Sequence, residues 1–155
     1  MNEKPHWLAP KEQHAWRSFV GVHQKLLSRI ERELQATANL SSADYAVLVA
    51  LTGTPDGRLR FQALLRAVEW SQSRASHHIA RMAKRGLVTR EDCPDDGRGV
   101  YVVVTPAGRQ AIEAAAPHHV ATVRSVVIDP LTTEELDTLA HLCQRMLHQM
   151  EQRSP

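Results

Sequence analysis

The sequence has little of several features that mark common classes of protein. Only two of its 155 residues are cysteines, too few for the disulfide framework of a small secreted protein. No apolar run approaches the length of a membrane-spanning helix, and the first residues lack the basic-then-apolar pattern of a signal peptide. We therefore expect one compact cytoplasmic subunit with no membrane partner.

Motifs of the common enzyme classes are also missing. There is no glycine-rich phosphate loop, no nucleophile elbow and no spacing typical of a catalytic triad. Nine histidines suggest a metal site, but the pairs His77-His78 and His118-His119 lie in predicted helices, where adjacent side chains point about 100° apart. No H-x-x-x-H or C-x-x-C pair occurs. The sequence therefore predicts neither an enzyme nor a cofactor or metal.

The net charge of +2 hides an uneven distribution. From Arg58 to Arg109 the chain has ten Lys and Arg against five Asp and Glu, a net charge of +5. The remaining residues have nine against twelve, a net charge of −3. A basic middle segment between acidic flanking segments indicates that the middle segment contacts phosphate groups.

The segment from Ser71 to Gly86 is predicted to form a helix with a narrow buried face. Ser71 is a favourable N-cap residue, and glycine often lies just past the end of a helix. Apolar residues recur at helical spacing at Ala75, Ile79 and Met82. The opposite face then presents hydroxyls, imidazole and cations, and such a helix can enter the major groove of DNA.

A hairpin and a second helix are predicted to follow. Residues 87–90 and 100–104 have the composition of strands, and Pro and Asp-Gly between them are typical of a hairpin tip. Thr105-Pro106 offers an N-cap followed by proline at the first helical position. Helix, hairpin with a cationic tip and helix, in this order, indicate a winged helix-turn-helix.

These residues carry a specific resemblance to the multiple-antibiotic-resistance regulator (MarR) family of bacterial transcription factors. The run SQSRASHHIARMAKRGLVTR is followed by DGRG and then by VTPAGR. The family's Asp-x-Arg wing signature lies at Asp96-Gly97-Arg98, and its Leu-Thr-x-x-Gly signature lies at residues 104–108, with Val104 in place of Leu. The resemblance covers roughly residues 11 to 150.

Shorter elements are predicted before the basic helix. Ser41 and Asp44 have the spacing of a capping box, which begins a second helix. The resemblance implies a short strand at Leu59-Arg60 beside the wing, and residues 61–68 form a third helix that would cross the DNA backbone. Pro117 should kink or briefly break the long helix after the wing.

The terminal helices have more apolar surface than the short middle segment can cover. We therefore expect a helical dimerisation domain formed by residues 1–37 and 106–155, around a winged helix-turn-helix DNA-binding domain at residues 38–105. The predicted fold class is mainly α with a small β-wing. A two-fold homodimer, which the resemblance also implies, predicts a palindromic operator with half-sites about one helical turn apart.

The predicted DNA-binding residues fall into three groups. Glutamine pairs well with adenine and arginine with guanine, and the candidates for base edges are Gln72, Ser73, Arg74 and His77. The candidates for phosphate contacts are Ser71, which could equally be only a cap, Ser76, Arg81 and Lys84. From the family pattern, Asp96 would orient the wing and Arg98 would insert into the minor groove.

The resemblance also implies a small aromatic or anionic effector, bound between the dimerisation and DNA-binding lobes. The predicted lining of that site is Trp16, Phe19, His23, Tyr45 and Leu48. Aromatic residues at helical spacing fit an ordinary core equally well, so the sequence is also consistent with a protein that binds no effector.

The predicted function is a sequence-specific, double-stranded DNA-binding transcriptional regulator, a homodimeric repressor released by a small ligand. One alternative is a redox- or metal-responsive regulator on the same scaffold. Against redox sensing, Cys93 lies near Asp92 and Asp95, whose charges disfavour a reactive thiolate, and Cys143 falls in an apolar stripe. The other alternative is a winged-helix module that binds protein, which the cationic wing disfavours.

Overall fold

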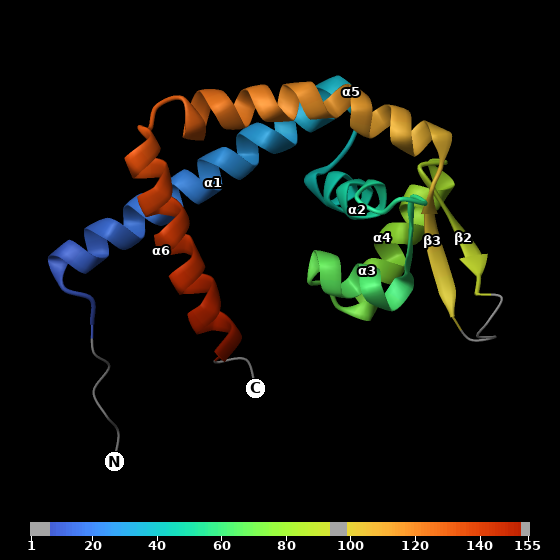
Figure 1. Cartoon of the computed structure of the whole chain (residues 1–155), viewed down its shortest axis with the longest axis horizontal. Coiled ribbons are helices and arrows are strands. Elements are labelled where there is room, and N and C mark those ends of the chain that lie inside the picture. Colours follow the sequence, from blue (N-terminus) through green and yellow to red (C-terminus); the bar gives the residue numbers. More distant parts are fainter. Residues whose placement is uncertain (1–6, 94–98, 153–155) are drawn as a thin grey trace, which may run out of the picture. The chain divides into compact units, whose positions relative to one another are not determined.

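The structure is a computed structural model that describes residues 7–93 and 99–152 (Figure 1). The elements follow in the order α1 (Pro10–Ala38), α2 (Ser42–Thr52), β1 (Arg58–Arg60), α3 (Phe61–Val68), α4 (Gln72–Lys84), β2 (Val88–Asp92), β3 (Val100–Val104), α5 (Pro106–Val123), the π-helical turn η1 (Arg124–Ile128) and α6 (Thr133–Gln152). The predicted fold class, mainly α with a small β-wing, is confirmed. The chain divides into two compact units, residues 1–119 and 120–155.

The first unit contains the winged helix, in which α2, α3 and α4 pack beside the β2–β3 hairpin (Figure 1). Its core is made of aliphatic side chains that these elements contribute at helical or alternating spacing. The largest fully buried ones include Leu48, Leu51, Leu64, Ile79 and Val102. Burial of such side chains contributes about 1.5–3 kcal/mol each, so the core fixes α4 firmly against the sheet.

The sheet has the strand order β1-β3-β2, and both pairings are antiparallel. Val102 lies at its centre, opposite Leu59 of β1 and Arg90 of β2. The predicted hairpin strands and the short strand beside the wing are therefore confirmed. Residues 94–98 lie outside the described residues, and the structure thus leaves Asp96 and Arg98 untested.

Both ends of α4 follow local chemistry. The hydroxyl of Ser71 accepts a hydrogen bond of 3.3 Å from the backbone N–H of Arg74, as an N-cap does. Gly86, just past the end of the helix, has φ +73°, a conformation that glycine adopts without strain. Both predicted ends of the helix are confirmed.

The start of α5 explains the spacing of Thr105 and Gly108. The Thr105 hydroxyl donates to the carbonyl of Gly86 and accepts a hydrogen bond of 3.0 Å from the Gly108 backbone N–H. A Cβ atom on Gly108 would lie 2.1 Å from the carbonyl oxygen of Leu87. Threonine therefore caps the helix, and only glycine fits where α5 passes over the chain that enters β2.

The helix is not broken at Pro117, as the sequence had suggested it could be. α5 continues through this residue to Val123, and η1 follows. Pro117 and Glu113, whose carbonyl loses its N–H partner, are both exposed, so water can solvate that carbonyl.

Each unit exposes large apolar side chains. In the first unit α1 exposes Trp16, Phe19, Val22 and Leu27, and in the second unit α6 exposes Leu139, Leu142, Met146, Leu147 and Met150. The structure has no helix both long enough and apolar enough to span a membrane among residues 7–93 and 99–152.

Candidate nucleic-acid interface

The helix α4 presents a buried face and an open polar face. The predicted apolar stripe is confirmed, because Ala75, Ile79 and Met82 are fully buried. The open face carries the predicted DNA-binding residues of this helix. Its exposed members are Ser71, Gln72, Ser73, Arg74, His77, Arg81 and Lys84, and Ser76 is half-buried.

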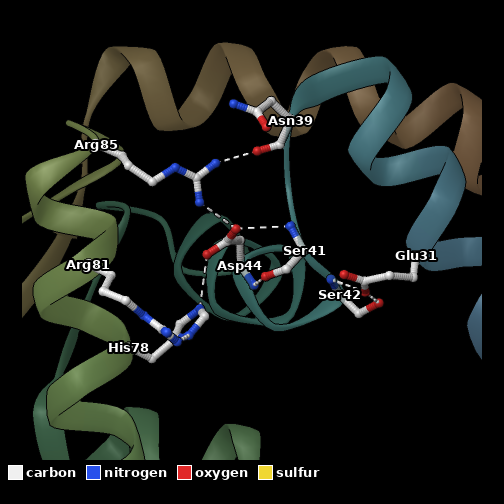
Figure 2. Close-up of polar contacts among 8 residues, drawn as sticks. All are labelled: Glu31, Asn39, Ser41, Ser42, Asp44, His78, Arg81 and Arg85. Atoms are coloured by element: carbon white, nitrogen blue, oxygen red, sulfur yellow. Dashed lines mark hydrogen bonds and ion pairs between the residues drawn. The ribbon is translucent and has the colours of Figure 1, made fainter.

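His78, next to the exposed His77, turns inward and is only 8% exposed. Its Nδ1 atom lies 3.0 Å from Nη2 of Arg81, which must be the donor, so the imidazole is neutral there and carries its proton on Nε2. Nε2 lies 2.9 Å from a carboxylate oxygen of Asp44 (Figure 2). The geometry of this contact is not that of a hydrogen bond. Burial lowers the pKa of His78, and together with the nearby cations Arg81 and Arg74 it outweighs the opposing effect of Asp44.

Asp44 is the centre of this cluster and is 2% exposed. One of its oxygens accepts hydrogen bonds of 2.9 Å from the Ser41 backbone N–H and of 2.7 Å from Nη1 of Arg85 (Figure 2). Burial alone would raise the pKa of Asp44, but the hydrogen bonds from Ser41 and Arg85 outweigh it and lower this pKa. The capping box predicted from Ser41 and Asp44 is confirmed.

Arg85 ties the end of α4 to the junction between α1 and α2. Besides Asp44, its guanidinium donates to the backbone carbonyl of Asn39, the C-cap residue of α1 (Figure 2). The sequence did not predict these contacts, because the residues that meet are 41 and 46 positions apart. Arg81, a predicted phosphate contact, is also engaged in this cluster through His78.

A polar cleft of about 310 Å³ opens beside the cluster. Its lining residues are Gln35, Asn39, Ser41, Asp44, His78, Arg81 and Arg85. None of the residues predicted to line an effector site belongs to it.

Arginines also brace the wing. Nη2 of Arg90, on β2, donates a hydrogen bond of 3.0 Å to the backbone carbonyl of Ser76 on α4. The guanidinium carbon atoms of Arg58 and Arg60 lie 4.8 Å and 5.8 Å from the ring centroid of Tyr101. Arg90 thus fixes β2 to the basic helix, and Arg58 and Arg60 fix β1 to β3.

Three of the five predicted effector-binding residues form a series of rings along α1. The ring centroids of Trp16 and Phe19 are 6.1 Å apart, and those of Phe19 and His23 are 6.5 Å apart, with both pairs stacked. All three side chains are exposed. These rings form an exposed aromatic surface along α1.

The other two residues lie in different surroundings. Leu48 is fully buried in the core, and half-buried Tyr45 packs against His119 with a centroid distance of 4.8 Å. Burial raises the pKa of Tyr45. Among the described residues no ring contact joins Tyr45 to the series on α1.

The structure also shows where the residues considered for metal or redox chemistry lie. No group of three or more His, Cys, Asp or Glu side chains converges on a possible metal position within the described ranges. Cys93 is buried at the end of β2, and Cys143 is half-buried on α6.

Comparisons with known proteins agree on one family. The model of the MarR family matches residues 38–99. The transcriptional regulator HosA of Escherichia coli O111:H- is 30% identical over 127 residues, which cover 82% of this chain and 90% of HosA.

Two solved structures extend the likeness to nearly the whole chain. AbsC, a MarR family transcriptional regulator from Streptomyces coelicolor, is 37% identical with a TM-score of 0.91, covering 96% of this chain and 100% of AbsC. Sco3205, a MarR family transcriptional regulator from the same organism solved in complex with DNA, is 37% identical with a TM-score of 0.88, covering 94% of this chain and 91% of Sco3205.

Proposed function

Because the chain belongs to the MarR family of DNA-binding transcriptional regulators, which are not enzymes, we propose that it is a homodimeric repressor that binds a palindromic operator in double-stranded DNA. The observation that carries this proposal is the open face of α4, which is polar, cationic and exposed from Ser71 to Lys84. Such a regulator acts in the bacterial cytoplasm, bound to the nucleoid through DNA.

The two ends of α4 have different roles in this proposal. In helix-turn-helix docking the first turn of the recognition helix reaches base edges, and here that turn carries Gln72, Ser73 and Arg74. Lys84 lies at the far end, where the helix leaves the floor of the groove and a cation meets phosphate. The DNA complex of Sco3205 supports a duplex as the partner.

The exposed apolar residues of α1 and α6 support a dimer. A contiguous apolar face is rarely left in water, and a second copy with the same faces can cover it. We assign residues 1–37 and 106–155 to dimerisation and residues 38–105 to DNA binding. Two-fold symmetry then places two copies of α4 on half-sites about one helical turn apart.

A small aromatic or anionic effector is the second part of the proposal. The exposed series Trp16, Phe19 and His23 on α1 offers flat rings on which an aromatic ligand can stack. Between the two lobes, such a ligand would release the repressor from its operator.

Selection of bound duplexes from a random DNA pool tests the core of the proposal. We expect a palindromic consensus, and Arg74→Ala should relax it at one position in each half-site with a loss of about 1–3 kcal/mol. Lys84→Ala should weaken binding evenly and flatten the salt slope by about one unit per site. Equal affinity for selected and random duplexes at about 0.15 M salt would contradict the proposal.

A further inference from the structure

We infer that Trp70 is a positioning residue for base reading, because its indole ring holds the guanidinium of Arg74 in place before DNA arrives. This inference rests on the proposed function and adds a determinant of specificity to it. Trp70 itself does not need to touch DNA in this arrangement.

The geometry places both side chains on one side of the helix start. Trp70 directly precedes the N-cap Ser71, and Arg74 lies four residues after Trp70. The guanidinium carbon of Arg74 lies over the indole ring, 4.4 Å from its centroid, within the distance of a cation–π interaction. Arg74 is exposed, whereas Trp70 is half-buried and packs against the core.

The indole ring is itself held from the protein side. The Trp70 backbone N–H donates a hydrogen bond of 3.1 Å to the carbonyl of Leu65. Its ring meets His78 edge-on, with a centroid distance of 5.1 Å and an interplanar angle of 79°. His78 is in turn fixed by its contacts with Arg81 and Asp44, so the ring under Arg74 rests on the buried polar cluster.

The contact leaves the hydrogen-bonding capacity of Arg74 free. A cation–π interaction satisfies no N–H donor, and within the described part of the chain no hydrogen bond or ion pair occupies the Arg74 side chain. A guanidinium reads guanine by donating two hydrogen bonds to O6 and N7. A side chain that is already ordered loses less conformational entropy when it makes them.

A double-mutant cycle tests this role. The readout is the discrimination ratio, which is the dissociation constant for a duplex changed at the base pair that Arg74→Ala no longer discriminates, divided by the dissociation constant for the duplex selected by the wild-type protein. Trp70→Leu keeps apolar volume but removes the ring, and we expect this ratio to fall about 3- to 10-fold. Trp70→Phe keeps an aromatic face and should lose less. In the Arg74→Ala background, Trp70→Leu should change the ratio no further.

A structural role alone would give a different pattern. If Trp70→Leu weakens binding to both duplexes equally, or weakens binding to the selected duplex equally with and without Arg74, the inference is overturned. NMR of the free wild-type protein gives a second measurement that needs no variant to fold. Ring-current shifts of the Arg74 side-chain protons are expected, and random-coil shifts with free averaging would overturn the inference.

Failure of the inference can be told apart from failure of the proposed function. A wild-type protein that prefers no duplex contradicts the function itself. A wild-type protein with a clear preference, which Trp70→Leu retains in full, contradicts only the role of Trp70.

Discussion

The carboxylate of Asp44, in the first turn of α2, accepts a hydrogen bond of 2.7 Å from Nη1 of Arg85, the C-cap residue of α4. The same guanidinium reaches the carbonyl of Asn39 at the end of α1. One buried acid therefore joins α4 to the junction of α1 and α2, the point where the predicted dimerisation and DNA-binding segments meet.

Asp44→Asn should destabilise the fold. The substitution keeps the shape of the side chain but leaves the guanidinium of Arg85 without its counter-ion. Removing one partner of a buried ion pair costs about 3–5 kcal/mol. Because the side chain of Arg85 is 40% exposed, we expect a smaller loss of about 2–3 kcal/mol in the free energy of unfolding, still set by that desolvation penalty.

Urea unfolding at a fixed protein concentration measures this loss. Asp56→Asn is the matched control, since Asp56 also pairs with an arginine at 2.7 Å, but its side chain is 55% exposed, against 3% for Asp44. The control should leave the unfolding midpoint unchanged. Equal midpoints for the two variants would show that the Asp44 pair contributes no more than a surface ion pair.

Acid should weaken the fold in two steps. Burial lowers the pKa of His78 from its usual 6.5, so the unfolded chain takes up this proton first, and stability is lost as the pH falls from 6.5 toward the folded pKa. The net lowering of the Asp44 pKa gives the same sign below its usual 3.8. Unfolding curves between pH 8 and pH 5 should show the first step, and His78→Gln should reduce it. A wild-type protein equally stable at both pH values would rule out the first step.

Local chemistry made much of the fold predictable. The caps at Ser41 and Ser71 depend on residues three positions away, and Gly86 ends α4 through its own φ angle. The stripe of Ala75, Ile79 and Met82 follows from helical spacing alone. These features lie within one element, so the sequence carries the whole signal.

Tertiary contacts account for what the sequence did not reveal. Helical periodicity predicted that one of the adjacent residues His77 and His78 faces outward. No local signal showed that His78 contacts Asp44, which lies 34 positions earlier. Likewise, the spacing of four residues between Trp70 and Arg74 is visible in the sequence. The cation–π contact between them also depends on the packing of the Trp70 ring against the core, which the sequence does not show. The aromatic residues of α1 had a local pattern, and the rings of Trp16, Phe19 and His23 follow it.

Gly108→Ala should be among the most damaging single-methyl substitutions. Its Cβ would approach the Leu87 carbonyl to 2.1 Å and Val104 to 3.0 Å, and since the first contact is backbone, α5 would have to move. Overpacking of this kind costs about 1–3 kcal/mol or more. Thermal unfolding should show a clear drop in the melting temperature.

Gly21→Ala is the opposite case and serves as the control. Gly21 lies inside α1 with nothing within 4 Å of its added Cβ, and alanine favours a helix over glycine by about 0.8–1 kcal/mol. This variant should be at least as stable as the wild type. A destabilised Gly21→Ala would indicate that a partner chain packs closely against the position.

Leu142→Glu should weaken self-association. Leu142 is 46% exposed on α6, and an interface that buries it would have to bury an unpaired carboxylate instead. Because a two-fold dimer contains the substitution twice, we expect the dissociation constant of the dimer to rise at least about tenfold, which corresponds to about 1.4 kcal/mol. Gln144→Glu adds the same charge about 200° further around the helix, at an exposed position, and should leave association unchanged. Sedimentation velocity over a concentration series measures the self-association of both variants.

Operator affinity should fall together with self-association, since each half-site then binds without the effective concentration that the second one supplies. A wild-type protein that stays a folded monomer at micromolar concentration would contradict the proposed dimer, and a Leu142→Glu variant that dimerises like the wild type would place the interface elsewhere than this face of α6.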